Sequence, residues 1–151
     1  MVTKSIFIPI DFEEEHKVYY TDCGDCHKTY PPYMLPARSW RRIIKDLDNH
    51  FGEEITEANI SKEARISILN YLTSNSSEYS TNKIAFRFIN SLEKDEAPKA
   101  ITKTDYWREI HKNIDPKKFK SKKVKSRAYC WSCHEGFEQG IFKNEKISIP
   151  K

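Results

Sequence analysis

Apolar residues recur along this chain at intervals of three and four positions, the period of an amphipathic α-helix, and strand-like alternation is scarce. The clearest stripe consists of Trp40, Ile43, Ile44, Leu47, His50 and Phe51. It predicts a helix that has Ser39 as its N-cap, runs to about Phe51 and stops at Gly52. His50 then lies on the buried face of this helix.

Three later segments repeat the pattern, and each begins at a residue that favours the N-cap position: Ser61, Thr81 and Thr104. The expected inner positions are Ala64, Ile68, Tyr71 and Leu72 in the first helix, Ile84, Ala85, Phe88, Ile89 and Leu92 in the second, and Tyr106, Trp107, Ile110 and His111 in the third. The third helix therefore has a histidine on its apolar face.

Irregular segments connect these helices. Asp11 or an adjacent residue begins a short helix with Val18 and Tyr19 on its inner side, and Ser126 caps another helix that leads into Cys130. The remaining segments are an extended proline-rich stretch at 30–36, a serine-rich loop at 74–80, a linker at 94–103 and an extended tail at 147–150. We therefore expect a mostly α fold with long loops and little or no β-structure.

The apolar share of the sequence is small for a chain that fills its own core. Only 38% of the residues are apolar and the mean hydropathy is −0.76, whereas aromatic residues make up 13%. A large apolar prosthetic group would account for this mismatch, because it supplies core that the sequence does not. Composition by itself favours a polar helical protein without such a group.

Charge is distributed unevenly around a net value of +4. Residues 11–15 are acidic, whereas residues 112–127 contain seven lysines and Arg127, interrupted only by the acidic Asp115. Such a stretch is either a solvated loop or a docking surface for an acidic partner. No nucleic-acid-binding module is recognisable, so we do not expect a nucleic-acid partner.

No segment reaches the roughly 18 to 20 apolar residues that span a bilayer, so we expect no membrane-spanning helix. The apolar residues 6–10 are too few for the core of a signal peptide, and no small-residue cleavage site follows them.

All four cysteines belong to two CxxCH segments: Cys23-Gly24-Asp25-Cys26-His27 and Cys130-Trp131-Ser132-Cys133-His134. This pattern is typical of c-type haem attachment. Two thiols about one helical turn apart can add to the two haem vinyl groups, and the histidine after the second cysteine then points at the iron. We therefore expect two covalently attached haem c groups.

Two other uses of these cysteines have to be weighed. A Cys₄ zinc site does not need a histidine after each pair, and the 107 positions between Cys23 and Cys130 are many for a zinc ribbon. Disulfides or a thioredoxin-like redox motif are the other alternative, but the βαβ pattern of that fold is missing. Haem is the favoured interpretation.

The second axial ligand of each iron decides its chemistry. His50 follows His27 by 23 positions, and His111 precedes His134 by 23 positions. Because both lie on apolar helix faces, we expect His27 and His50 to ligate the first haem iron, and His134 and His111 the second. A crossed pairing stays open.

The remaining candidates are less well placed. Met34 lies only seven positions after His27 in a proline-rich loop, which makes methionine ligation awkward. His16 precedes the first motif next to acidic residues and is expected at the surface rather than on an iron. We interpret five aromatic residues as packing groups around the haems: Trp40, Phe51, Trp107, Tyr129 and Trp131.

Several further segments make the chain resemble the bacterial dihaem cytochromes c, the DHC family. They are Tyr30-Pro31-Pro32, Leu35-Pro36-Ala37-Arg38-Ser39-Trp40, Asn49-His50-Phe51-Gly52-Glu53, Trp107 with His111, Ser126-Arg127-Ala128, and the end from Gly140-Ile141-Phe142 to Ile147-Ser148-Ile149-Pro150. Met34 stands where a leucine is expected, and the lysines of 117–125 look particular to this chain.

The resemblance implies a small helical dihaem c-type cytochrome whose loops wrap two low-potential bis-histidine haems. It implies a periplasmic electron carrier, so we expect a signal peptide to have been removed. One family member donates electrons to a small high-spin monohaem cytochrome that binds oxygen; a membrane quinol-oxidising cytochrome is the other partner class considered. We divide the chain into a first haem region at 1–95 and a second at 96–151, with one compact unit as the alternative.

Three functions are compatible with these features. With both irons six-coordinate, the protein is an electron carrier and not an enzyme. With one iron open, it is a haem enzyme or a ligand-binding haem protein. The third hypothesis is that the protein is a small electron-transfer subunit of a larger reductase. Spectra distinguish the first two, because an open ferric iron is high-spin.

Overall fold

The computed structural model describes residues 16–137, 140 and 142–151. Its α-helices are α2 (Ala37–Lys45), α3 (Lys62–Ser74), α4 (Lys83–Asn90), α5 (Asp105–His111) and α6 (Pro116–Phe119). Single helical turns are η1 (Tyr19–Cys23), η2 (Pro32–Met34), η3 (Leu47–Asn49), η4 (Ser77–Tyr79), η5 (Ile101–Lys103), η6 (Cys130–Ser132) and η8 (Asn144–Lys146). Two isolated β-bridges occur, and no strand forms within the described residues, as the mostly α prediction requires.

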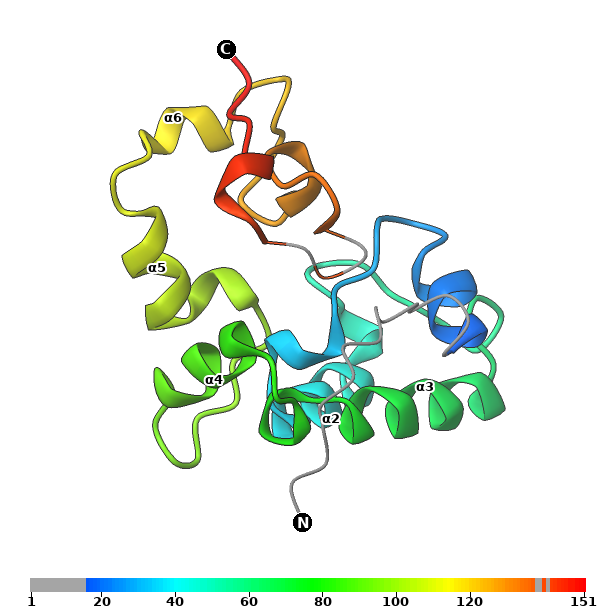
Figure 1. The fold of residues 1–151 in the computed structure, drawn as a ribbon. Coiled ribbons are helices and arrows are strands. Elements are labelled where there is room, and N and C mark those ends of the chain that lie inside the picture. The colour runs from blue at the N-terminus through cyan, green and yellow to red at the C-terminus, as the bar shows by residue number, and fades with distance from the viewer. Residues whose placement is uncertain (1–15, 138–139, 141) are drawn as a thin grey trace.

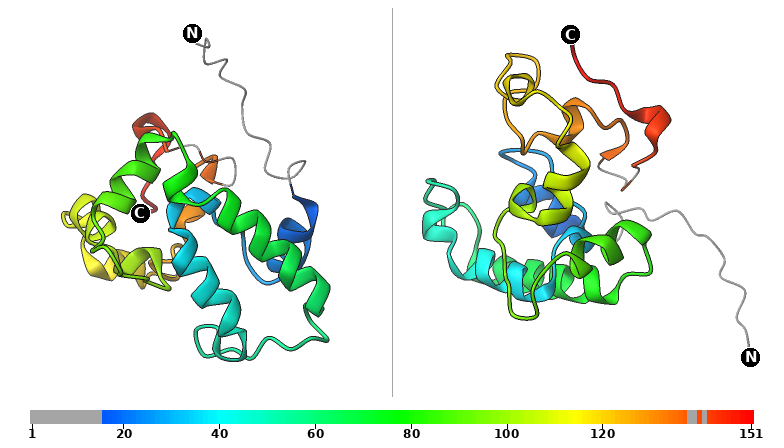
Figure 2. Two further views of the ribbon diagram at one scale, coloured as in Figure 1. Left: turned by 90° about the horizontal axis from the view of Figure 1, so that it is seen from below. Right: turned by 90° about the vertical axis from the view of Figure 1, so that its left-hand side faces the viewer.

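In Figure 1 the helices α2, α3 and α4 form the lower part of the molecule, and α6 and the C-terminal segment form the upper part. Helices α2 and α3 pack against each other, η1 contacts α3, and α4 packs on η2 and η4. Helix α5 touches α4, and α5 and α6 then lead up to the segment that carries η6 and η8 (Figures 1 and 2). None of the helices in the described ranges is long and apolar enough to cross a membrane.

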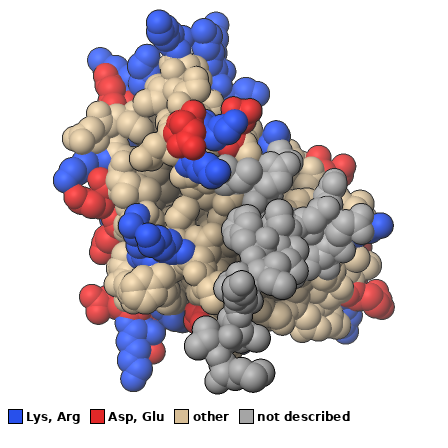
Figure 3. Space-filling view, viewed as in Figure 1, with Lys and Arg blue, Asp and Glu red and all other residues tan. Residues whose placement is uncertain are grey.

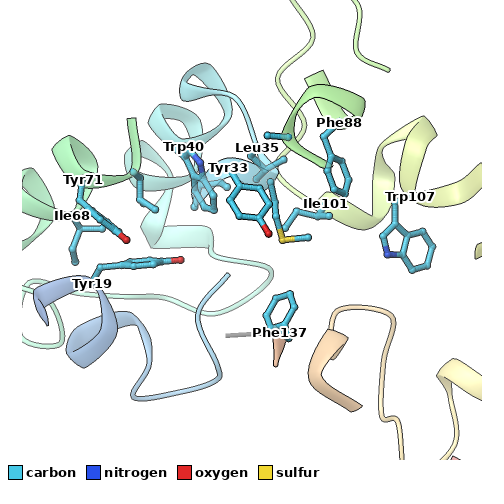
Figure 4. Packing of buried hydrophobic residues seen from close by; sticks show 14 of the residues in the cluster. Tyr19, Tyr33, Leu35, Trp40, Ile68, Tyr71, Phe88, Ile101, Trp107 and Phe137 are labelled. Atoms are coloured by element: carbon cyan, nitrogen blue, oxygen red, sulfur yellow. The ribbon is translucent and has the colours of Figure 1, made fainter. Parts of the chain in front are cut away.

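The apolar core lies mainly in the lower part. Figure 4 shows the packing of Tyr19, Tyr33, Leu35, Trp40, Ile68, Tyr71, Phe88, Ile101, Trp107 and Phe137. Residues 31–37 are buried throughout, and the indole Nε1 of Trp40 donates a hydrogen bond to the carbonyl oxygen of Pro32 at 2.8 Å. The proline-rich stretch is therefore a core element containing the turn η2, and its predicted extended conformation is only partly correct.

Two of the predicted N-caps, Ser61 and Thr104, are confirmed. The hydroxyls of Ser61 and Thr104 accept hydrogen bonds from the third residues of α3 and α5. Ser39, in contrast, is buried inside α2 and is not its N-cap. Helix α2 begins at Ala37, whose backbone N–H donates to the carboxylate of Glu78 at 2.8 Å, so a distant side chain caps this helix.

The predicted continuation of α2 to Phe51 is wrong, because the helix ends at Lys45 and only the turn η3 follows. His50 and Glu53 form a β-bridge with backbone bonds of 2.7 and 3.1 Å. Between them Phe51 has φ +52° and Gly52 has φ +91°, as a type I′ turn requires at both central positions. His50 thus lies on a tight turn and not on a helix face.

Four further expectations need correction. The described residues after Ser126 form no α-helix; the Ser126 hydroxyl accepts a hydrogen bond from the N–H of Ala128 in a turn, directly after Lys125, which has φ +77°. Val18 and Ile110 are 36% and 53% exposed rather than inward.

Helix α4 is capped by Asn82, one residue after the predicted Thr81. The serine-rich loop contains η4, and its Ser76 and Ser77 are buried. The expected helix start near residue 11 lies outside the described residues.

Candidate functional site

The first CxxCH segment begins at Cys23, which is the last residue of the π-helical turn η1. Tyr19 anchors this turn, because its hydroxyl donates to the carbonyl oxygen of Tyr30 at 2.6 Å. The N–H of Gly24 donates to the carbonyl of Tyr20 at 3.1 Å. A Cβ on Gly24 would lie 2.1 Å from that same carbonyl oxygen, so only glycine allows the backbone to approach this closely. No sequence pattern indicates this constraint on Gly24.

His27 ends the first segment and faces His50. Their ring centroids are 6.5 Å apart and the ring planes differ by 14°. The Nδ1 of His27 lies 2.7 Å from the carbonyl oxygen of Lys28, to which it can donate only as the Nδ1–H tautomer. The His50–Glu53 bridge holds the other ring in place.

The second segment is held by the C-terminal tail. The N–H of Ser148 donates to the carbonyl oxygen of Cys133 at 2.8 Å, and His134 and Ile147 form the second β-bridge. The extended tail predicted at 147–150 therefore has a structural role, which is to hold the residue that ends this CxxCH segment.

His134 faces His111 from the end of α5. The two ring centroids are 6.3 Å apart, with ring planes at 76°. The Nδ1 of His111 lies 2.7 Å from the carbonyl oxygen of Trp107, and the two rings stack with centroids 4.2 Å apart. The Nδ1 of His134 is buried and has no hydrogen-bond partner among the described residues.

The centroid separations of the two histidine pairs, 6.5 and 6.3 Å, are close to the separation of two imidazoles that share one metal ion. An imidazole nitrogen coordinates a first-row metal such as zinc at about 2.0 Å, so two imidazoles on opposite sides of one ion have centroids about 6 Å apart. In His27 and His111 the Nδ1–H bond to a carbonyl leaves the Nε2 lone pair available. Burial lowers the pKa of His50, His111 and His134, which favours the neutral form that binds metal.

Each cysteine pair directly precedes its CxxCH histidine in the chain, and no disulfide joins any of the four cysteines, all of which the structure describes. Burial raises the pKa of the Cys23 and Cys130 thiols to about 12 and also raises that of Cys133. A thiol with so high a pKa is a poor redox nucleophile. No cluster of three His, Cys, Asp or Glu side chains suited to a metal ion exists in the described ranges, so the Cys₄ zinc alternative has no structural support.

The model of the dihaem cytochrome c family, DHC, matches residues 19–142. The chain belongs to this family. It therefore carries two covalently attached haem c groups, and it is a haem protein of an electron-transfer class.

Solved structures of dihaem cytochromes c agree with this assignment. The chain is similar to a diheme cytochrome c from Rhodobacter sphaeroides, with 33% identity, a TM-score of 0.69, and coverage of 84% of this chain and 96% of that one. It is also similar to the diheme cytochrome sb-DHC from Shewanella baltica OS155, with 28% identity, a TM-score of 0.69, and coverage of 88% and 91%. The predicted fold class is thereby confirmed. The comparison with curated proteins gives no match.

Two hollows of this dihaem cytochrome c border its second histidine pair. One of about 350 Å³ lies beside His134 and is also lined by Trp131, Cys133 and Phe137. The other, of about 150 Å³, lies beside His111. Its lining combines aromatic rings with cations, namely Trp107, Phe119, Arg108, Lys112 and Arg127. Apolar walls with cations at the edge suit a flat apolar group that carries carboxylates.

Aromatic rings connect the two CxxCH segments of the cytochrome. The indole of Trp131 lies parallel to the ring of His27, with centroids 6.4 Å apart and planes within 8°. Tyr30 packs against Trp131 and Phe137, and its hydroxyl donates to the carbonyl of Ala128 at 2.7 Å. From the sequence Trp131 is expected only as a packing group and Tyr30 has no expected role, because no local pattern reveals a contact across about a hundred positions.

The remaining candidate ligands have other contacts. Met34 is 3% exposed and belongs to the apolar core. His16 is half-buried against α3, with its Nε2 3.0 Å from the Ser67 hydroxyl and its ring 4.7 Å from that of Tyr71, so the expected surface position is only partly correct. Phe51, expected to pack, is 65% exposed on its turn.

Proposed function

We propose that this dihaem cytochrome c is a periplasmic electron carrier with two low-potential, bis-histidine haems. One haem is attached to Cys23 and Cys26 and ligated by His27 and His50. The other is attached to Cys130 and Cys133 and ligated by His134 and His111. The observation that carries the proposal is that each CxxCH histidine faces one other histidine, at 6.5 Å in the first pair and 6.3 Å in the second. These contacts favour local pairing over crossed pairing.

Haem supplies one-electron iron chemistry, and the chain determines which form of it is available. With a histidine on both sides of each iron, no position is left for a substrate, which favours outer-sphere electron transfer. Histidine ligation also lacks the thioether sulfur that raises the potential of Met/His haems. The carbonyls of Lys28 and Trp107 accept Nδ1–H bonds, orient the rings of His27 and His111 and increase their basicity, which favours the ferric state further.

The attachment chemistry and the family support the proposed location and partner classes. Covalent haem attachment in bacteria takes place outside the cytoplasm, which supports a periplasmic location. An electron carrier of this kind exchanges electrons with other redox proteins; a small high-spin monohaem cytochrome and a membrane quinol-oxidising cytochrome are the two partner classes we consider.

Visible and electron paramagnetic resonance spectra of the holoprotein, with a pyridine haemochrome count, test the proposal. We expect two low-spin haems per chain, no methionine–iron band and no carbon monoxide adduct. His50→Ala and His111→Ala should each convert one haem to a high-spin, carbon-monoxide-binding form, whereas the control His16→Ala should leave both haems low-spin. A wild-type protein that already binds carbon monoxide would overturn the proposal and favour a haem enzyme or ligand-binding protein.

A further inference from the structure

The two histidines outside the CxxCH segments, His50 and His111, lie in or next to loops of opposite charge. Residues 46–61, around His50, contain five carboxylates and no Lys or Arg. Residues 112–127, directly after His111, contain eight cations and one carboxylate, and we call them the basic lobe. The eight cations are Lys112, Lys117, Lys118, Lys120, Lys122, Lys123, Lys125 and Arg127, and all eight are exposed. The loop around His50 and the segment after His111 therefore carry opposite net charge.

The basic lobe has a defined structure rather than being a simple solvated chain. Asp115 caps α6 through the N–H of Lys117 at 3.0 Å, so the one carboxylate of the lobe is used within it. Val124 is 2% exposed and anchors the loop after α6. The Ser132 hydroxyl lies 3.3 Å from the carbonyl of Val124, which ties the lobe to the second CxxCH segment.

The lobe also contacts the second histidine pair directly. The ring of Phe119, in α6, lies 6.4 Å from that of His111 and 5.6 Å from that of Trp107. The Arg127 guanidinium carbon lies 5.7 Å from the Phe119 centroid. A protein that binds the basic lobe is therefore next to the second haem site. His50 and the acidic loop belong to the segment between α2 and α3.

The cations of the lobe are available to a partner. Lys112 pairs with Glu109 at 2.6 Å, and no other cation of the lobe has an ion pair with an acidic side chain that the structure describes. Figure 3 shows Lys and Arg side chains gathered at the upper end of the molecule, where Figure 1 places α6 and the C-terminus. Figure 2 shows the yellow α6 region apart from the cyan-green loop that follows α2.

We propose that the basic lobe is the docking surface for an acidic redox protein, so that the second haem site is the port through which electrons pass to or from that partner. Four exposed carboxylates around His50, namely Asp48, Glu53, Glu54 and Glu57, repel the same partner from this loop, whereas Asp46 is paired with Lys99. One electron moves as one protein is oxidised and the other reduced, and no bond is made or broken. Complementary charge of this kind raises the association rate and selects the docking face. The inference rests on the proposed electron-carrier function.

A gold electrode coated with a carboxylate-terminated alkanethiol provides a defined anionic probe for the holoprotein. The wild type should adsorb at low ionic strength, give a voltammetric wave, and desorb as salt is added. Reversing three lobe charges, with Lys117→Glu, Lys120→Glu and Lys123→Glu together, should lower the adsorbed amount about tenfold or more.

The control has the same net charge with the changes placed on the lower part of the molecule. Lys62→Glu, Lys83→Glu and Lys94→Glu alter exposed lysines away from the lobe and should leave adsorption within about twofold of the wild type. Equal loss in both triple variants would show that only net charge matters and would overturn the proposal. Two low-spin haems in either variant would show that the carrier function stands independently of this result.

Fast-scan voltammetry on the same surface identifies the port. Methionine ligation raises a haem potential, so His111→Met should shift the wave that survives at the highest scan rates, whereas His50→Met should leave that wave in place. Low-spin spectra and a count of two haems verify that each variant is assembled. A fast wave that follows His50→Met instead would place the port at the first haem and overturn the proposal.

Discussion

In the first CxxCH segment the residue after the leading cysteine is Gly24, and in the second it is Trp131. Gly24 occupies a place where a Cβ would lie 2.1 Å from a backbone oxygen, whereas the Trp131 indole reaches the ring of His27 at 6.4 Å. The same motif position thus serves close packing within one site and contact between sites in the other. The first x position of CxxCH therefore differs in its packing role between the two segments, although the motif allows any residue there.

The histidines are also fixed differently in the two sites. In the first site the CxxCH histidine, His27, has its Nδ1 hydrogen-bonded to a carbonyl oxygen. In the second site the other histidine, His111 of α5, makes this kind of bond. The Nδ1 of His134 is buried and has no hydrogen-bond partner in the part of the chain that the structure describes. Each pair therefore combines one ring held by a hydrogen bond with one held only by its backbone and packing, in opposite order.

The largest effect should come from removing one haem attachment. The lower part has its own apolar core, whereas among described residues after 111 only Val124 and Phe137 are buried apolar residues. Cys130→Ala with Cys133→Ala should therefore leave one haem and a folded lower part, but expose the C-terminal segment to proteolysis. Haemochrome counting and limited proteolysis with mass spectrometry measure both outcomes.

The matched variant is Cys23→Ala with Cys26→Ala. Because η1 and the proline-rich stretch belong to the main core, we expect general destabilisation with cleavage throughout the chain. The same C-terminal cleavage pattern in both double variants would contradict the asymmetry of the two parts.

A smaller but still large effect is expected for Gly24→Ala. The added Cβ meets backbone, which cannot move aside as a flexible side chain can, so the free energy of unfolding should fall by about 1–3 kcal/mol. The loss should be accompanied by lower occupancy of the first haem only. Thermal unfolding and haem counting check this, with exposed Asp25→Ala as a control within about 0.5 kcal/mol of the wild type. Unchanged stability of Gly24→Ala would refute the close approach.

Trp131→Leu should have an intermediate effect that reaches the opposite site. Losing the aromatic contacts with His27 and Tyr30 should cost about 1–2 kcal/mol and alter the low-spin paramagnetic resonance signal of the first haem. Trp131→Phe keeps a ring at this position and should retain most of both properties. A change confined to the second haem's signal would mean that Trp131 serves only its own site.

The sequence predicted those features that depend on neighbours in the chain. Ser61 and Thr104 act as caps as expected, because a cap contacts a residue only three positions away. The N-terminal cap of α2 could not be predicted, since the acceptor comes from the distant Glu78. The end of α2 at Lys45 was also missed, because η3 and then a turn with positive φ angles at Phe51 and Gly52 replace the expected helix.

The candidate site shows the same division. The separations of 23 positions led to the pairs that the structure brings together, His27 with His50 and His111 with His134, although His50 reaches its partner from a turn rather than a helix. Their ligation stays a prediction, as does the division of the chain at residue 95. The contact between Tyr30 and Ala128 crosses that boundary and depends on tertiary packing, which no local pattern reveals.

The smallest expected effect concerns an ion pair near the first site. Lys99 donates to the Asp46 carboxylate after α2, and this hydrogen bond lowers the pKa of that carboxyl group. Because the folded pKa lies below the unfolded one, the pair stabilises the fold at neutral pH, and this contribution disappears as the pH falls through the folded pKa.

Asp46→Asn should therefore shift the urea midpoint slightly at pH 7 and not at all in acid where the wild-type carboxyl is protonated. The pair is partly exposed, so the shift should be small and should shrink further in salt. The control is Asp105→Asn near the second site, whose carboxylate lies 3.9 Å from Arg108 at a more exposed position, and its midpoint should not move measurably. Equal shifts in the two variants would mean that the Asp46–Lys99 contact does no more for the first site than an ordinary surface pair does for the second.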